Sequence, residues 1–192
     1  MDDVRTYTSF AGVRQIVSAD LKTMLLQTKE YLDRDGGDSV LIFEDQTGRQ
    51  VDFDFRGAPQ EVVDRVEASK ARPGPGRPKL GVISREVSLL PRHWEWLEQQ
   101  PQGISAALRR LVDEARKREP GKERARLARE AASRFMWAMA GNLPDFEEAS
   151  RALFAQDQGR FEELIRDWPE DIRAHLVRMV LETWPLEGAD AS

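Results

Sequence analysis

Two aspartates at strand spacing and the two histidines are the side chains in this sequence that most suggest metal or acid–base chemistry. Asp52 and Asp54 alternate with apolar residues over 51–55, so on a strand both carboxylates share one face and could hold a cation. His93 and His175 are the two histidines, and each falls on an expected helix without a nearby nucleophile. No third ligand lies near the aspartates in the sequence, and a solvated strand face explains them better. We therefore expect no catalytic residue, metal site, cofactor or enzymatic activity.

Phosphate binding is the other chemistry that the sequence suggests, and it centres on residues 68–81, ASKARPGPGRPKLG. Prolines and glycines leave this segment few backbone donors and little apolar area, which predicts a linker. It has no acidic side chain, and Gly76-Arg77-Pro78 resembles the core of an AT-hook, an arm that lies in the minor groove of A·T-rich DNA. The resemblance implies DNA contacts for Arg72, Arg77 and Lys79. A stiff spacer between domains is the alternative interpretation.

The charge of the chain is divided sharply along its length. The net charge is −5, but residues 70–134 carry 16 basic and 8 acidic side chains, a net of +8. Residues 1–69 have a net charge of −6 (8 basic, 14 acidic) and residues 135–192 one of −7 (5 basic, 12 acidic). A basic middle between acidic ends is typical of a localised nucleic-acid surface. Solvated helix faces are the simpler explanation for any single charge.

Residues 82–119 follow the linker and contain a compact series of short elements. Alternating residues over 83–89 predict a strand, and Pro91 favours the start of a helix. Gly103 ends that helix, and Ser105 is a suitable N-cap for a second one. The apolar residues that we expect in the core of this unit are Val87, Leu89, Trp94, Leu97, Leu108, Leu111 and Val112.

Strand, helix, glycine turn and helix, with Leu90-Pro91 and Gly103-Ile104-Ser105 at the connecting points, resemble the ribbon-helix-helix DNA-binding fold. In that family the strand pairs with its copy from a second subunit, and the two-stranded ribbon enters the major groove. The resemblance implies a homodimer in which Ser84, Glu86 and Ser88 face the bases. It also implies that the start of the second helix, around Ser105 over residues 105–107, meets a phosphate. Glu86 is acidic, where the family usually has basic, amide or threonine side chains.

The chain as a whole also resembles a DUF2239-like family of uncharacterised bacterial proteins, which implies no function. Residues 1–67 predict a small α+β domain in the order ββαββα, with a helix capped by Ser18 and strands at 39–44 and 51–55. Residues 120–186 predict an all-α domain of short helices bounded by glycine or proline. Its core would hold Trp137, Trp168 and Trp184, and residues 187–192 would form a disordered tail.

Two functions follow from these observations. The first is a dimeric DNA-binding protein, a transcriptional regulator that binds double-stranded DNA through residues 82–119. The second is a protein-interaction module that dimerises through the same unit and binds an unidentified protein through its acidic end domains. The sequence has no cysteine, no apolar run of membrane-spanning length and no signal peptide, so we expect a cytoplasmic protein without a membrane partner.

Overall fold

The computed structural model describes residues 5–35, 39–70, 85–118, 120–181 and 184. The predicted order of strands, helices and linker segments makes an α+β protein, and the structure confirms this fold class. The chain divides into two compact units. The outer unit consists of Met1–Lys70 and Arg124–Ser192, and the central unit of Ala71–Glu123.

A four-stranded antiparallel sheet forms the middle of the outer unit. Its strands are β1 (Thr6–Ala11), β2 (Arg14–Asp20), β3 (Val40–Glu44) and β4 (Arg49–Gln50), in the order β2-β1-β3-β4. A tight turn at Gly12, whose φ is +58°, joins β1 to β2. Helix α1 (Leu21–Asp35) follows β2, and helix α2 (Pro59–Lys70) follows β4. The predicted order ββαββα is confirmed.

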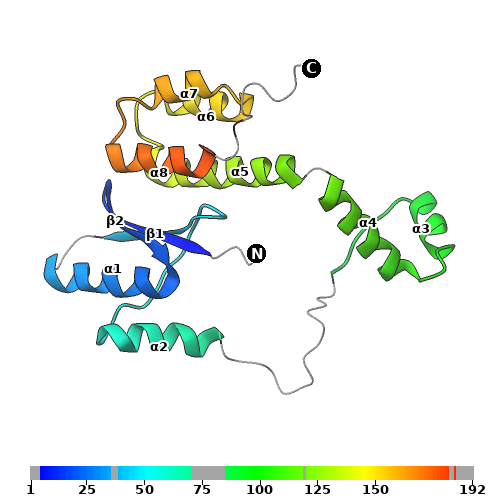
Figure 1. Cartoon of the computed structure of the whole chain (residues 1–192), viewed down its shortest axis with the longest axis horizontal. Helices are drawn as coiled ribbons and strands as arrows, with labels where there is room; N and C mark the ends of the chain where they lie inside the picture. The colour runs from blue at the N-terminus through cyan, green and yellow to red at the C-terminus, as the bar shows by residue number, and fades with distance from the viewer. Residues whose placement is uncertain (1–4, 36–38, 71–84, 119, 182–183, 185–192) are drawn as a thin grey trace. The chain divides into compact units, whose positions relative to one another are not determined.

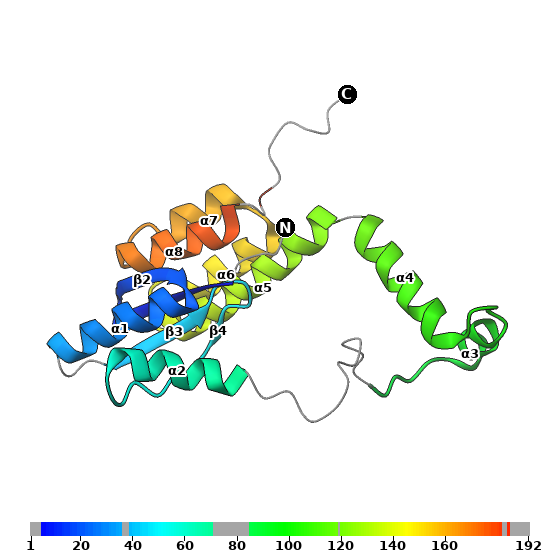
Figure 2. The ribbon, with the colours of Figure 1, turned by 60° about the horizontal axis from the view of Figure 1, so that its bottom comes forward.

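Helices cover both faces of this sheet (Figures 1 and 2). Strand side chains alternate in direction, so Tyr7 and Ile42 pack against α1 and α2, whereas Phe10 and Phe43 point the other way. The second face packs against α5 (Pro120–Ala140) and α8 (Glu170–Leu181). Beyond these two helices lie α6 (Phe146–Ala155) and α7 (Gln158–Leu164).

The helices after residue 124 share one core with the sheet. Phe10 and Phe43 belong to the same buried cluster as Phe135 of α5, with the ring centroids of Phe43 and Phe135 4.9 Å apart. Trp168 and Trp184 are buried in this cluster. The prediction for Trp137 was wrong, because its side chain is 67% exposed and contacts Phe146 only at the edge of the core. The domain boundaries expected from the sequence stay a prediction.

Two local predictions in the N-terminal segment were also wrong. Residues 51–55 form no strand, because β4 pairs with β3 only over Arg49–Gln50. Ser18 does not cap α1, since it lies within β2 and its hydroxyl is 2.8 Å from that of Thr8. Asp20 is the cap, and its carboxylate accepts hydrogen bonds from the backbone N–H groups of Lys22 and Thr23.

The helices that lie wholly within the described part of the central unit are α3 (Pro91–Glu98) and α4 (Ile104–Arg118). Pro91 occupies the first position of α3, as the sequence predicts. Gly103 takes a φ of +80° at the turn, and its carbonyl accepts the backbone N–H of Ala107 at 3.0 Å. Gly103 therefore precedes the first residue of α4, and the prediction that Ser105 is the N-cap was wrong. Within the described parts of the chain, no helix is long and apolar enough to span a membrane.

Candidate nucleic-acid interface

An apolar slot lies between the two helices of the central unit. It has a volume of about 260 Å³ and is lined by one residue ahead of α3 and by residues of both helices, namely Leu89, His93, Trp96, Leu97, Leu108 and Leu111. Leu97 is 3% exposed and forms the closed part of the slot, while Trp96 at 46% and Leu111 remain exposed. Two short helices and one preceding segment cannot enclose these side chains alone.

Further apolar side chains of the central unit face solvent. Val87 is 57% exposed, Val112 55%, and Leu90 is also exposed. Most exposed apolar residues in soluble proteins are scattered, whereas these three lie in the same short unit as the open slot. These side chains and the slot are called the pairing surface below.

The residues predicted for a dimer core fall into three groups. Leu97 of α3 is buried, and Leu89, Trp94 and Leu108 are half-buried. Val87, Leu111 and Val112 are exposed in the single chain. Trp96 was not among the core residues predicted from the sequence, which on this helix were Trp94 and Leu97. The spacing of His93, Trp96 and Leu97 at i, i+3 and i+4 could have indicated that Trp96 lines the slot.

The segment ahead of α3 forms no strand over its described residues, 85–90. Leu90 is extended, with φ −67° and ψ 150°, but a strand needs a neighbour to supply its ladder hydrogen bonds. Glu86 and Ser88, both predicted to face DNA, are exposed. The other predicted contacts ahead of this segment lie outside the described residues: Arg72, Arg77, Lys79 and Ser84.

The start of α4 is open to solvent and polar. A hollow of about 460 Å³ is lined there by Ser105 and Arg109, with Glu98 at its α3 side. Ser105 is exposed, and Arg109 Nε donates a hydrogen bond of 3.1 Å to the Ser105 carbonyl. Ala107, within the region predicted to meet phosphate, is 3% exposed, so its side chain cannot contact a ligand in this hollow. The free N–H groups of a helix N-terminus favour an anion.

The described basic side chains of the central unit lie on its surface. They are Arg85, Arg92, Arg109, Arg110, Lys117 and Lys122. One of them, Arg110, is within 3.8 Å of Glu114 on the same helix, an exposed pair that contributes little stability. Exposed guanidinium groups of this kind suit phosphate better than they suit an apolar core.

Other candidate sites in the described residues are less suited to binding a ligand. Arg56 forms a two-point ion pair with Asp54, and its hydrogen bond holds the pKa of Asp54 well below its usual range. Asp54 also lies 3.6 Å from Arg65, so this carboxylate is occupied by the protein's own cations. No cluster of three metal-binding side chains occurs in the described parts of the chain.

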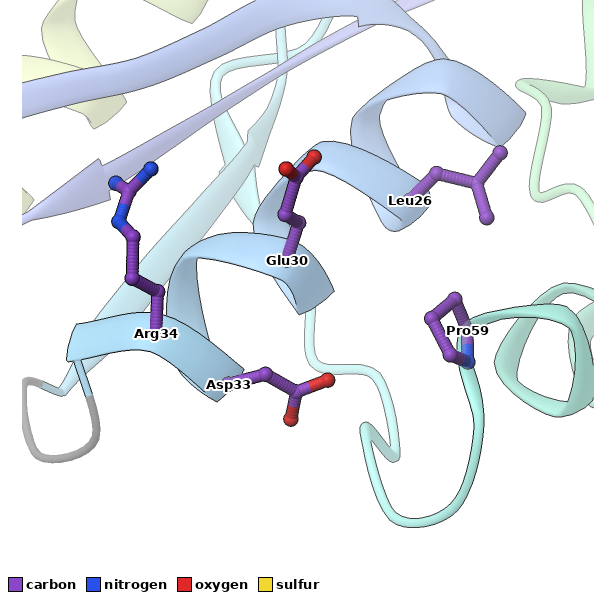
Figure 3. Close-up of a pocket in the computed structure, with 5 residues that line it drawn as sticks. All are labelled: Leu26, Glu30, Asp33, Arg34 and Pro59. Atoms are coloured by element: carbon purple, nitrogen blue, oxygen red, sulfur yellow. The ribbon is translucent and has the colours of Figure 1, made fainter.

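A shallow groove separates α1 from the start of α2 in the outer unit. Figure 3 shows Glu30, Asp33 and Arg34 projecting from α1, with Pro59 across the groove. Its volume is about 510 Å³, but opposite charges line the same side, and Asp33 is paired with Lys29. The groove presents no uniform chemistry that would select a ligand.

Comparison with known proteins identifies a family but no activity. The family described as an uncharacterized protein conserved in bacteria, DUF2239, matches residues 6–180. Neither a search of curated proteins nor a search of solved structures finds a match.

Proposed function

Since the chain belongs to the DUF2239 family, whose description includes no activity, we propose a function from its own residues: a dimeric DNA-binding protein. The observation that carries this proposal is the pairing surface beside an extended segment. A ribbon-helix-helix arrangement accounts for both, because a second copy would pair with the segment and cover the slot.

Pairing would satisfy two needs of the central unit. The backbone of residues 85–90 belongs to no strand, and an antiparallel copy supplies the missing ladder partners. The same contact would remove Val87, Leu111 and Val112 from water, at about 25 cal/mol per Å² of apolar area. A second copy is the simplest partner because a two-fold axis brings identical apolar surfaces together.

DNA binding is supported by the charge of the sequence segment that contains the pairing surface. Residues 70–134 carry a net charge of +8, while both ends of the chain are acidic. On the paired ribbon, Glu86 and Ser88 would project toward the major groove, and the open start of α4 would meet the phosphate backbone. The basic linker would add phosphate or minor-groove contacts beside the ribbon, and the dimer would act as a transcriptional regulator.

One observation favours the second candidate, a protein-interaction module. Glu86 lies in the middle of the face that would meet DNA, and its exposed carboxylate repels phosphate. In this alternative the central unit still dimerises, but the ribbon face contacts another protein.

A gel-shift assay with random and genomic DNA, run at low and moderate salt, separates the two candidates. DNA binding predicts a retarded complex whose affinity falls with salt, by a log–log slope of about 0.9 for each neutralised phosphate. Val112→Glu should abolish the complex without unfolding the chain, because Val112 is already 55% exposed. Leu181→Glu is the matched control, since Leu181 has the same 55% exposure and lies on α8. No retardation of any DNA at low salt would leave the interaction module as the better account.

A further inference from the structure

A buried histidine joins α8 to the sheet of the outer unit. His175 is 2% exposed, and its ring packs against both Phe10 of β1 and Phe135 of α5, with centroid distances of 5.6 and 4.5 Å. The proposed DNA binding makes no use of this residue. A titratable side chain in an apolar position is costly unless it stays neutral.

The hydrogen bonds of His175 fix which nitrogen carries the proton. Arg178 Nη2 lies 3.1 Å from His175 Nδ1, and a guanidinium can only donate, so Nδ1 must accept. The neutral ring therefore carries its proton on Nε2. That nitrogen is buried without a hydrogen-bond partner in the described structure, and Asp45 Oδ1 lies 3.7 Å away.

Two side chains of α8 beside the ring form hydrogen bonds with Gln15 of β2. Arg178 Nη2 also donates to Gln15 Oε1 at 2.7 Å, and Asp171 accepts the backbone N–H of Gln15 at 2.8 Å. Asp45, in the turn after β3, lies 2.8 Å from the Thr8 hydroxyl. The polar contacts between α8 and the sheet are thus concentrated around the imidazole.

We propose that His175 is an acid-sensitive latch: the neutral imidazole holds α8 on the sheet, and its protonation releases the helix. Protonation makes Nδ1 a donor, and two donors then face each other where Arg178 now bonds to the ring. The Arg178 guanidinium adds like-charge repulsion. The new charge would lie against the rings of Phe10 and Phe135, with Asp45 Oδ1 3.7 Å from Nε2.

The pH range in which α8 would be released follows from the pKa of His175 in the docked helix and in the released helix. Burial, together with the charge of Arg178, lowers the pKa of His175 to about 4 when α8 is docked. In released α8 the ring regains a pKa of about 6.5, so only the released form takes up a proton between these values. Docking is therefore fully present above about pH 6.5 and weakens as the pH falls toward 4, by about 30-fold at pH 5 for the histidine alone.

Asp45 opposes part of this effect. Burial raises the pKa of Asp45, so the docked form takes up a proton at this carboxyl before the released form does. That uptake strengthens docking as the pH falls. Among the described residues, Asp45 and Arg178 are the charged groups beside His175, since β1 and α5 contribute Phe10 and Phe135.

Amide hydrogen exchange of the full chain at about pH 7.5 and about pH 5 tests the latch, after correction for the intrinsic exchange rates. We expect the protection factors of α8 to fall at the lower pH, by up to about 30-fold, with those of α1 unchanged. His175→Gln cannot titrate and should remove the loss of protection at the lower pH, which leaves only the opposite trend that Asp45 contributes. Asp45→Asn should steepen it. Equal changes in α1 and α8, or no change in α8, would overturn the proposal.

A measurement on the unaltered chain covers the case in which a variant fails to fold. Nitrogen chemical shifts of the imidazole report its charge directly. At about pH 5.5 the docked ring should be neutral and protonated on Nε2, because burial lowers the pKa of His175 to about 4. A ring that is charged at that pH while α8 stays protected would refute the latch.

Discussion

Arg134 of α5 donates a hydrogen bond of 2.8 Å to the backbone carbonyl of Thr47, which lies 87 positions earlier in the chain. Thr47 belongs to the turn between β3 and β4, and the next residue, Gly48, lies directly against the backbone of Ala131. A β-carbon at Gly48 would be 1.9 Å from the Ala131 carbonyl oxygen. This contact holds the sheet and α5 together, so the two ends of the sequence form one unit.

Gly48→Ala should therefore reduce the free energy of unfolding by about 3 kcal/mol, through a left-handed backbone and a steric clash combined. Gly12→Ala is the matched control, because Gly12 has a similar φ of +58° but no atom within 4 Å of a β-carbon. It should cost only about 1 kcal/mol. Urea denaturation of both variants measures the difference. Equal losses would show that the turn does not depend on its contact with α5.

The cap of α1 gives a second test. Asp20→Ala should reduce the free energy of unfolding by about 1 kcal/mol, because two backbone N–H groups and the Thr23 hydroxyl lose their acceptor. Asp20→Asn keeps a side-chain oxygen and should cost less. Thermal unfolding of the two variants provides the measurement. A larger loss for the asparagine variant would mean that charge, rather than capping, stabilises this end of the helix.

Local sequence pattern determines only part of this fold. Periodicity located the strands and helices of the outer unit, because alternation and helical spacing reflect burial on one face. The alternating residues 51–55 failed as a strand because the chain leaves β3 after Val51, whose N–H still bonds to the Ile42 carbonyl, although alternation alone would allow the pairing to continue. Trp137 failed as a core residue because its hydrophobicity does not reveal which side of α5 faces the core. The crowding of Gly48 against Ala131 joins residues far apart in sequence, and no local pattern predicts it.

Part of the pairing surface was predictable, because helical spacing identifies residues that share one face of a helix. The sequence indicated Leu97, Leu108 and Leu111 from their spacing, and all three line the slot. Trp96 was not indicated, because a two-turn helix has too few positions to define one apolar face clearly. The predicted contacts in the linker and at Ser84 lie outside the described residues.

Glu86 allows a test of sequence readout. On a paired ribbon its carboxylate can accept a hydrogen bond from a cytosine amino group while it repels phosphate. Glu86→Gln should then bind non-specific DNA more tightly and lose about 1–3 kcal/mol of discrimination at a C·G position. Selection from a randomised DNA pool, run in parallel with the original chain, measures both effects. Glu95→Gln on α3 is the control, because Glu95 is also exposed and lies outside residues 83–89, which would form the ribbon. If all three proteins select the same motif, or none, Glu86 does not read bases.

Sedimentation velocity of the full chain with a fluorescently labelled duplex tests the central proposal most directly, since it reports assembly and DNA binding together. The proposal predicts that the free chain sediments as a dimer at micromolar concentration. It also predicts that the duplex sediments with two bound chains at low salt. Val112→Glu should remove both the free dimer and this complex. A chain that sediments as a monomer and leaves the duplex at its own rate would contradict the proposed dimer and its DNA binding.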